Sequence, residues 1–303
     1  MNAIPSTAIA PAVQADPRPP GFWTRFAWFA PAVAVLLAVT LYPTAVVLWL
    51  SVHRTRLYEV VEGVGLANYV SVITSPAFLE LSLNSLLYVF GALAVVLPLG
   101  LASALALQNI ARGAAYVRTL LLLPWTLSMG VVGCFWLWLL NPSYGPMSYL
   151  MRSLGMEPGL MLGDPSLALV LVILVTAWWS FPYVMVMMSA SLQSIPAELY
   201  EAIDIDGGGL RARLRHAVWP HIAPTLGSTA LALGILYLTL ITLILVLTGG
   251  GPLGSTATWS FEVFSSAFRS VDLSPSSVIS VVVLVVNLFL GYLYTRLTGR
   301  VSG

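Results

Sequence analysis

The sequence has no lysine, a single cysteine and very few charged residues. Charged residues make up 8% of its 303 positions and hydrophobic residues 58%, whereas a soluble globular protein has about 25% and about 45–50%. A soluble fold of this length could not cover so much apolar surface with so few charges. We therefore expect lipid to surround most of the chain.

The missing residue types also exclude several kinds of chemistry. A P-loop nucleotide site needs a lysine on the terminal phosphates, so this chain is not a P-loop ATPase. Cys134 has no second cysteine with which to form a disulfide or a metal site. The three histidines, His53, His216 and His221, show no metal-ligand pattern. With a net charge of +1, nothing points to a nucleic-acid partner. We expect neither an enzyme nor a bound metal or cofactor.

Six apolar segments are long enough to cross a membrane as helices. A bilayer core about 30 Å thick needs roughly 20 helical residues, and none of the six contains Asp, Glu or Arg. We expect an all-α integral membrane protein, with residues 1–25 as a flexible tail and residues 26–300 as one six-helix domain. The first apolar run is too long for a signal-peptide core, so we expect it to stay uncleaved. The predicted spans are Phe26–Leu50, Leu81–Leu107, Leu120–Leu140, Leu167–Leu192, Leu226–Leu247 and Val278–Thr295.

The positions of the arginines predict which side of the membrane each loop occupies. If the N-terminus lies inside, nine arginines are inside and four outside, and cytoplasmic loops carry the excess of positive charge. The four outside are Arg54, Arg56, Arg152 and Arg269. Both termini are therefore predicted to be cytoplasmic.

One cytoplasmic loop, residues 195–224, concentrates charge: "ELYEAIDIDGGGLRARLRHAVWPHIAP" holds four acidic residues and three arginines. Pro196 suits a first helical turn, Glu198 and Glu201 complement the helix dipole, and the glycines at 207–209 end the helix. A second short helix follows before the next span. Such a surface helix could lie among lipid headgroups or seat its face in a groove on a soluble partner. The acidic first half argues against attraction to anionic lipid, which favours the partner.

The loop contains a specific order of residues: Glu201-Ala202-Ile203, then Asp206-Gly207, then "AVWPHIAP". This order resembles the EAA loop of binding-protein-dependent ABC importer permeases. Ile203 stands where that family usually has alanine, and "DGGG" replaces its common Asp-Gly-Ala.

The resemblance extends over residues from about 40 to 270. "LYPTAVVLWLSV", "GLANYVSVITSPAF", "WWSFPYVMVMMSASLQSIPAELYEA" and "VLTGGGPLGSTATWSFEVFSSAF" are similar to landmarks of the family, in the same order. The carbohydrate-uptake branch, which includes maltose, trehalose and glycerol-3-phosphate importers, looks most similar. "RSVDLSPSSVIS" at 269–280 departs from the usual glycine- and alanine-rich entry to the last span. The resemblance implies a type I ABC importer permease fold, multi-pass in a bacterial plasma (inner) membrane.

The resemblance also implies partners. Separate ATPase subunits would hydrolyse ATP, and the loop would be the coupling helix that sits in a cleft of an ATPase dimer. A second six-span permease would fill the other cleft, and a solute-binding protein would deliver cargo to the outer loops. The implied coupling residues are Glu198, Glu201, Ala202, Asp206, Gly207, Arg213 and Pro220.

A sugar path needs aromatic faces and hydroxyl or amide groups within apolar helices. Residues near "FPY" and "LTGGGP" resemble cargo-contacting positions of the maltose-type permease, and the second span adds an Asn and a Tyr one turn apart. Each side chain could instead bond a neighbouring helix or its own backbone. The candidates are Thr176, Trp179, Ser180, Tyr237, Thr239, Asn84 and Tyr88. The implied cargo is a disaccharide such as trehalose or maltose, or else glycerol-3-phosphate.

Two other classes of protein remain as alternatives. An ion-coupled secondary transporter would place ion-binding or titratable groups at mid-membrane, often within inverted repeats. A membrane scaffold would have no need of the charged loop. We favour the ATP-driven importer because the spans lack charged residues and the loop carries the family's pattern.

Overall fold

The computed structural model describes residues 22–110, 112–157 and 159–299, and most of them are helical. The chain forms two compact units, Met1–Val46 and Val47–Gly303. Helix α1 (Phe22–Ser51), with Pro31 and Pro43 inside it, accounts for the described residues of the first unit. The predicted tail, residues 1–25, lies mostly outside the described residues.

The second unit contains a β-hairpin and all the remaining helices. The hairpin and the first helices are β1 (His53–Arg56), β2 (Glu59–Gly63), α2 (Ala67–Ile73), α3 (Pro76–Gln108), α4 (Ala114–Thr126), α5 (Met129–Leu139), α6 (Pro146–Ser153), η1 (Met161–Gly163) and α7 (Pro165–Gln193). The later helices are α8 (Ala197–Ile205), α9 (Leu210–Ala212), the π-helix η2 (Arg213–Val218), α10 (Trp219–Thr239), α11 (Thr242–Leu247), η3 (Pro252–Gly254), α12 (Trp259–Phe264), the π-helix η4 (Ser265–Arg269) and α13 (Leu273–Gly299).

Five helical runs among the described residues are long and apolar enough to cross a membrane, and one bent pair makes a sixth if it counts as a single span. They overlap the first, second, fourth, fifth and sixth predicted segments, with the fifth shifted toward the N-terminus. The five runs are Trp28–Ser51, Pro76–Gln108, Pro165–Gln193, Leu210–Thr239 and Leu273–Arg296.

The third predicted segment, Leu120–Leu140, is not one continuous helix. Helices α4 and α5 meet at a bend of 96°. Leu127 and Ser128 have extended backbone, with ψ of 140° and 145°, and the Ser128 side chain accepts a hydrogen bond from the Val131 N–H. Ser128 therefore caps the start of a new helix. The apolar pattern runs unchanged through this point, which is why the sequence predicted no break.

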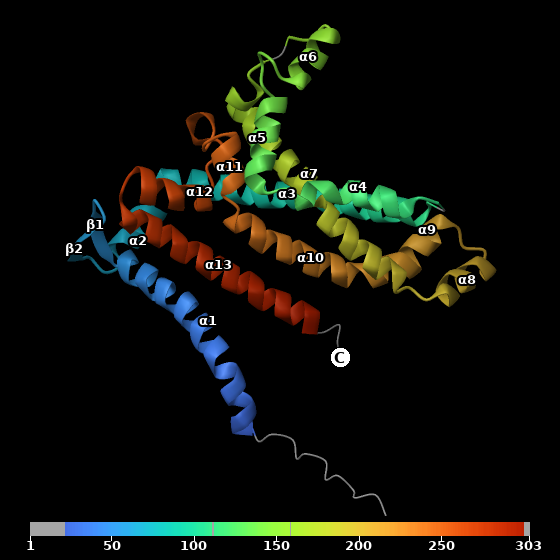
Figure 1. Ribbon diagram of the computed structural model, residues 1–303, viewed down its shortest axis with the longest axis horizontal. Coiled ribbons are helices and arrows are strands. Elements are labelled where there is room, and N and C mark those ends of the chain that lie inside the picture. The colour runs from blue at the N-terminus through green and yellow to red at the C-terminus, as the bar shows by residue number, and fades with distance from the viewer. Residues whose placement is uncertain (1–21, 111, 158, 300–303) are drawn as a thin grey trace, which may run out of the picture. The chain divides into compact units, whose positions relative to one another are not determined.

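The fifth predicted segment, Leu226–Leu247, is also interrupted, because α10 ends at Thr239 and α11 begins at Thr242. The halves that follow the two breaks, α5 and α11, pack on each other and project together from the other helices (Figure 1). A Cβ at Gly133 of α5 would lie 2.8 Å from Val246 Cγ1 of α11. The glycine therefore sets how closely these two half-helices approach.

Side chains from other helices bond the carbonyls at both breaks. Trp179 Nε1 on α7 donates to Leu127 O at 3.1 Å, and Ser260 Oγ on α12 donates to Leu238 O. Hydrocarbon offers no partner for a free carbonyl, so non-helical backbone at membrane depth needs internal bonds of this kind.

The centre of the second unit is the contact between α3 and α7, which lie beside α10, and α10 beside α13 (Figure 1). A Cβ at Gly100 of α3 would lie 2.4 Å from Val184 Cβ on α7, and one at Gly91 would lie 2.8 Å from Ile173 Cδ1. Gly91 and Gly100 thus let α3 and α7 pack backbone to side chain at two places, as small residues do in membranes.

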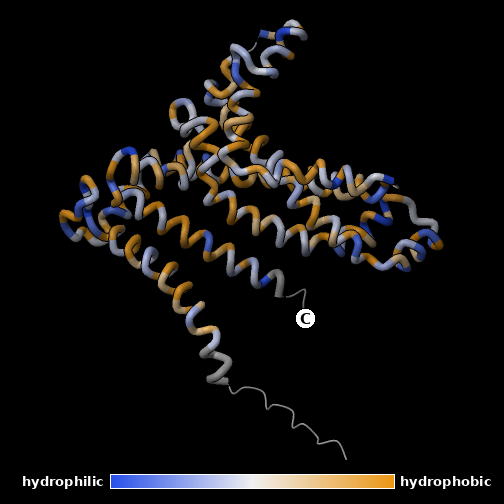
Figure 2. Tube along the Cα trace, in the orientation of Figure 1, coloured by the Kyte–Doolittle hydropathy of each residue, from blue (hydrophilic) through white to orange (hydrophobic). Residues whose placement is uncertain are grey.

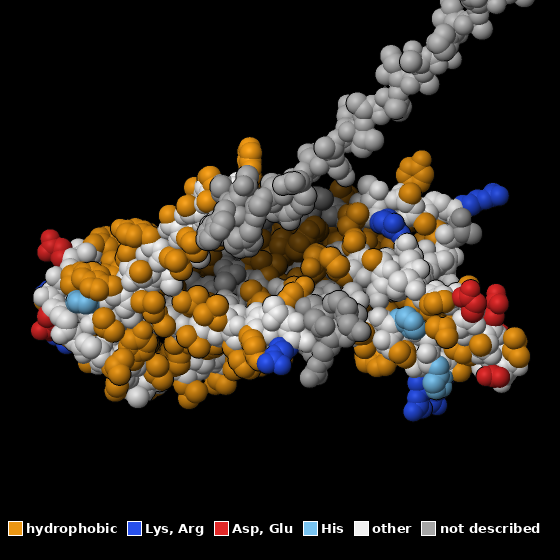
Figure 3. Space-filling model, turned by 90° about the horizontal axis from the view of Figure 1, so that it is seen from below, with side chains coloured by type: hydrophobic (Ala, Val, Ile, Leu, Met, Phe, Trp, Pro, Cys, Tyr) orange, Lys and Arg blue, Asp and Glu red, His pale blue; other side chains and the backbone are white. Residues whose placement is uncertain are grey.

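Polar residues gather at opposite ends of the second unit. Hydrophilic positions cluster around α8 and α9 at one end and around the hairpin at the other (Figure 2). In the view of Figure 3, most charged and histidine side chains lie toward the same two ends, and mainly hydrophobic side chains lie between them, with one basic side chain near the middle. This distribution matches two water-facing ends separated by a lipid-facing middle. The segment at 269–280 belongs to the hairpin end, where Asp272 and Ser274 bond Thr55 of β1.

We expect Gly100→Ala to destabilise the protein because the new methyl group overlaps Val184 across the α3–α7 contact. Overpacking of this kind costs about 1–3 kcal/mol. The matched control is Gly227→Ala on α10, where a Cβ meets nothing within 4 Å. Thermal unfolding in detergent measures both variants, and equal midpoints would contradict the packing argument.

Candidate functional site: the charged loop and the polar cluster between the spans

The charged loop folds as helix α8, a glycine turn and a long helical run. The turn is a Schellman motif: Gly208 N donates to Ile203 O at 2.7 Å and Gly207 N donates to Asp204 O at 3.0 Å. Gly207 has a φ of 71°, the left-handed region that glycine enters without steric cost. The predicted break at the glycines is confirmed, with a defined geometry.

Gly208 is required by its contact with Ile203. A Cβ at position 208 would lie 2.6 Å from Ile203 Cγ2 and 2.9 Å from Ile203 O. The two departures from the family pattern, Ile203 and the extra glycine, therefore meet in space. The larger side chain at 203 occupies the volume that an alanine methyl at 208 would need.

An ion pair closes the turn from outside. Arg213 Nε donates to Asp204 Oδ1 at 2.8 Å, and Arg213 Nη2 donates to Asp204 Oδ2. This hydrogen bonding, together with the opposite charge, raises the pKa of Arg213 above its ordinary value. Arg213, predicted as a coupling residue, thus ties the second half of the loop to α8. Because the pair is exposed, we assign it a role in geometry and little in stability.

The second half of the loop joins the fifth span without a break. Residues 210–239 form one helical run, in which α9 and the π-helix η2 lead directly into α10. Pro220 lies inside this run, just after η2. The sequence instead predicted a separate surface helix, because proline usually marks a helix boundary. Any movement of the loop is therefore carried straight into the membrane.

The loop presents both charged and apolar side chains to water. Six of the seven predicted coupling residues are exposed, and Arg213 is half-buried; the six are Glu198, Glu201, Ala202, Asp206, Gly207 and Pro220. Sequence reasoning missed Ile205 and Leu210, which flank the glycine turn and are 86% and 74% exposed. The missed signal is the position of Ile205, three and seven residues after Ala202 and Glu198, on the face otherwise occupied by polar residues.

Four of the predicted substrate-path residues form one buried polar cluster. Tyr88 Oη on α3 and Thr176 Oγ1 on α7 lie 3.1 Å apart, and Ser180 Oγ on α7 lies 2.5 Å from Tyr237 Oη on α10. The tyrosine rings lie 6.1 Å apart, centroid to centroid. Each of the four residues is at most 1% exposed. In this conformation the cluster joins three spans, so contact with cargo would require these bonds to open.

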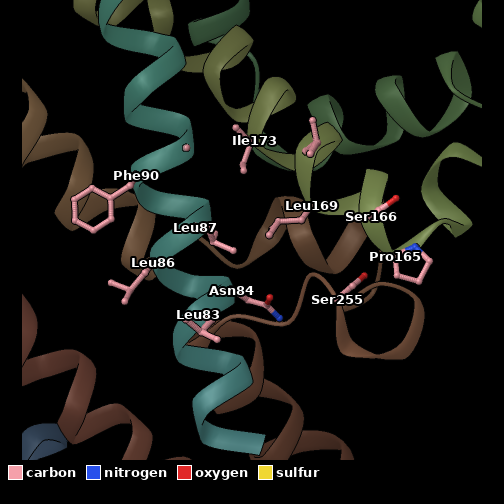
Figure 4. Close-up of a pocket in the computed structure, with 12 residues that line it drawn as sticks. Leu83, Asn84, Leu86, Leu87, Phe90, Pro165, Ser166, Leu169, Ile173 and Ser255 are labelled. Atoms are coloured by element: carbon pink, nitrogen blue, oxygen red, sulfur yellow. The ribbon is translucent and has the colours of Figure 1, made fainter.

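The other three predicted residues lie apart from this cluster. Trp179 bonds the α4–α5 break and stacks near Trp125, with ring centroids 4.3 Å apart. Asn84 lines a pocket of about 620 Å³ between α3 and α7, and its amide donates to Gly254 O (Figure 4). Thr239 lines a pocket of about 350 Å³ with Ser260 and residues of α13. The structure therefore brings four of the seven together and leaves three at separate places.

Comparison with known proteins supplies the context for these features. Residues 96–303 match the family described as "Binding-protein-dependent transport system inner membrane component". The chain is 29% identical over 267 residues to the trehalose/maltose transport system permease protein MalF of Thermococcus litoralis, covering 88% of this chain and 90% of that protein. It is 31% identical over 264 residues to the sn-glycerol-3-phosphate transport system permease protein UgpA of Agrobacterium fabrum, covering 85% of this chain and 88% of that one.

A solved structure has the same fold. A chain of a bacterial alginate ABC transporter, crystallised in complex with an alginate pentasaccharide-bound periplasmic protein, superposes with a TM-score of 0.76 at 19% sequence identity. The match covers 92% of this chain and 95% of that chain. The likeness shows that the two chains share a fold.

We expect Gly208→Ala to loosen the turn and Ile203→Ala/Gly208→Ala to restore it in part, because Ile203→Ala removes the Cγ2 that the new methyl group meets while the backbone oxygen of residue 203 stays in place. Trypsin cleavage after Arg211 reports the opening of the turn. An overpacking cost of about 1.4 kcal/mol would speed cleavage about tenfold in the single variant. Gly209→Ala is the control, since a Cβ there meets nothing within 4 Å. Equal cleavage of the single and double variants would contradict the pairing of 203 with 208.

Proposed function

This chain belongs to the family of binding-protein-dependent transport system inner membrane components, and we propose that it is the permease subunit of an ATP-driven importer that moves a sugar across a bacterial plasma membrane. The family match over residues 96–303 supports the class of transporter. The charged loop supports the source of energy, because it gives the chain a water-facing contact for a soluble motor.

The exposed apolar pair on the loop is the observation that carries the proposal. Ile205 and Leu210 stand on either side of a turn that is fixed by two backbone hydrogen bonds. Apolar side chains on a rigid tip, surrounded by charges, suit insertion into a cleft on a partner protein. The predicted acidic residues Glu198 and Glu201 would then lie at the rim of that contact.

The shape of the loop explains how a motor could drive the spans. The Schellman turn and the Asp204–Arg213 pair connect α8 to η2, and η2 continues into α10. A force on α8 would therefore reach the fifth span through a continuous run of backbone. ATP would need to favour the closed motor by a few kcal/mol to shift such an equilibrium decisively.

The proposed assembly contains more than this chain. A motor of two ATPase subunits offers two clefts and this chain supplies one loop, so a second six-span permease would supply the other. A solute-binding protein would deliver cargo from outside. The family's description as binding-protein-dependent supports this last partner.

We propose a neutral sugar as cargo, with a disaccharide such as trehalose or maltose first and glycerol-3-phosphate second. The trehalose/maltose and glycerol-3-phosphate transport proteins among the relatives support both candidates. Among the residues that the structure describes, no charged one lines the pockets beside Asn84 and Thr239, which favours the uncharged sugar. An ion-coupled carrier would have to bind its coupling ion. In the part of the chain that the structure describes, no three His, Cys, Asp or Glu side chains are grouped so that they could hold a metal ion.

The proposal is tested by purifying the tagged chain in mild detergent and identifying the proteins that accompany it. We expect an ATPase with a nucleotide-binding P-loop and a second six-span permease. Reconstituted in liposomes, the complex should accumulate sugar only with ATP and a solute-binding protein. Accumulation by the isolated chain without ATP would overturn the proposal and support an ion-coupled carrier.

Within that experiment, Ile205→Ser should release the ATPase, because the substitution removes the most exposed apolar side chain of the loop. Central interface residues typically cost about 2 kcal/mol or more when truncated, so we expect at least a roughly tenfold loss of co-purified ATPase. Leu66→Ser is the control, since Leu66 is similarly exposed beside the hairpin at the opposite end. Equal loss from both variants would show that Ile205 is not an anchor.

For the substrate path, Thr239→Val should weaken cargo recognition. Thr239 Oγ1 donates to Leu236 O at 2.9 Å, so its lone pairs are free to accept a hydrogen bond from a sugar hydroxyl. We expect the apparent KM for the sugar to rise about tenfold with little change in maximal rate. Thr119→Val on α4, whose hydroxyl also bonds its own helix, is the control. An unchanged KM would remove Thr239 from the path.

A further inference from the structure

The hairpin that follows the first span has an unusual turn. Its two strands are joined by only Leu57 and Tyr58, and these residues have φ of 51° and 66°. Positive φ at both positions is the geometry of a type I′ turn, which strongly favours Asn-Gly. A branched apolar residue and an aromatic residue meet a steric penalty there, so something other than ease of turning explains their presence.

The base of the hairpin is held firmly by the start of α13. Thr55 N donates to Ser274 Oγ at 2.7 Å, Thr55 Oγ1 donates to Asp272 Oδ1 at 3.0 Å, and Thr55 Oγ1 accepts from Leu273 N at 2.9 Å. Thr55 is buried. The segment at 269–280, which departs from the family pattern, therefore serves to fix this hairpin. A strained turn persists only where its surroundings determine it in this way.

The same hairpin is joined to the end of α1. Asn68 Nδ2 donates to Ser51 O at 3.0 Å and to His53 O at 2.9 Å, which satisfies carbonyls at the end of the helix. Tyr69 Oη lies 2.8 Å from Ser51 Oγ. The hairpin is consequently pre-organised by contacts from both α2 and α13, and its tip has little freedom to lose when it binds.

The tip exposes apolar surface next to a polar hollow. Leu57 is 69% exposed and Tyr58 is 52% exposed. Beside them lies a pocket of about 590 Å³, to which Arg56 and Asn68 contribute polar groups. Arg54 bonds Glu62 at 2.5 Å across the strands, whereas Arg56 has no ion-pair partner among the described residues. The surface thus combines an apolar projection with the opposite charges of Arg56 and Glu59, neither of which has an ion-pair partner among the described residues.

We propose that this hairpin tip, residues 56–61, is a docking surface for the solute-binding protein, which would offer an apolar depression with an acidic side chain at its rim for Arg56. The inference rests on the proposed function, which supplies such a partner on the outer side, where the arginine distribution places the hairpin. Insertion into lipid fits less well. Arg56 and Glu59 flank the turn in register, so burying the tip in hydrocarbon would carry two charges with it.

The test uses the whole transporter, reconstituted in nanodiscs, with ATP hydrolysis measured against the concentration of sugar-loaded binding protein. Leu57→Asn/Tyr58→Gly removes the apolar side chains and keeps the turn, because it installs the pair that a type I′ turn favours. We expect the half-stimulating concentration of binding protein to rise about tenfold, with the maximal rate and thermal midpoint preserved. Arg56→Gln should raise it as well, and Arg56→Lys should raise it less.

Leu57→Met/Tyr58→Phe is the control that retains the apolar surface and should behave as the wild type. If the wild type is stimulated and Leu57→Asn/Tyr58→Gly is stimulated equally well, the docking surface is overturned and the proposed function stands. If the wild type is not stimulated by its binding protein, the proposed function fails, and this inference with it. The chain has ten tryptophans of its own, so the readout is the additional fluorescence of a Tyr58→Trp variant over the wild type; quenching of that additional fluorescence by brominated lipid would place the tip in the membrane and also overturn the proposal.

Discussion

Hydrocarbon offers a polypeptide no hydrogen bonds, and every departure from regular helix in this protein has to satisfy that constraint from within. The third and fifth spans are interrupted, and each interruption leaves a carbonyl that a side chain of a different helix bonds. Trp179 serves the first break and Ser260 the second. The half-helices beyond the breaks, α5 and α11, then pack on each other. The breaks are therefore parts of one arrangement, in which α7 and α12 are needed for the spans beside them to bend.

The same constraint decides what polar side chains do between the spans. Tyr88, Thr176, Ser180 and Tyr237 bond one another because no water competes for them, and they join α3, α7 and α10. Thr239, by contrast, lines a pocket at the break between α10 and α11, and Asn84 lines one between α3 and α7. Interrupted helices are where transporters commonly bind their cargo, since the backbone there has polar groups to offer. In the present conformation we therefore favour Thr239 over the four buried cluster residues as a side chain that contacts cargo.

Where the chain meets water, different rules apply. At one end, the glycine turn of the loop is fixed by two backbone hydrogen bonds and an ion pair, and Ile205 and Leu210 on either side of it are exposed to water. At the other end, the two turn residues of the hairpin, Leu57 and Tyr58, have positive φ and are exposed to water. Both ends keep apolar side chains exposed on rigid supports, which is costly in isolation and useful for binding other proteins.

The sequence by itself determined the class of this protein, because composition and the length of apolar runs depend on the solvent and not on the neighbours of each residue. It determined the glycine turn of the loop, since glycine is the residue that enters positive φ without steric cost, and the family through the order of residues around Glu201 and Gly207. Tertiary structure alone decided where the spans break, because Leu127 and Leu240 sit in mostly apolar runs and their breaks depend on partners far away in sequence. Tertiary structure alone also decided that Ile203 occupies the space beside Gly208. It likewise placed the prolines at 220 and 224 within a helix that continues from the loop. Contacts between distant residues carry this information, and no local pattern records them.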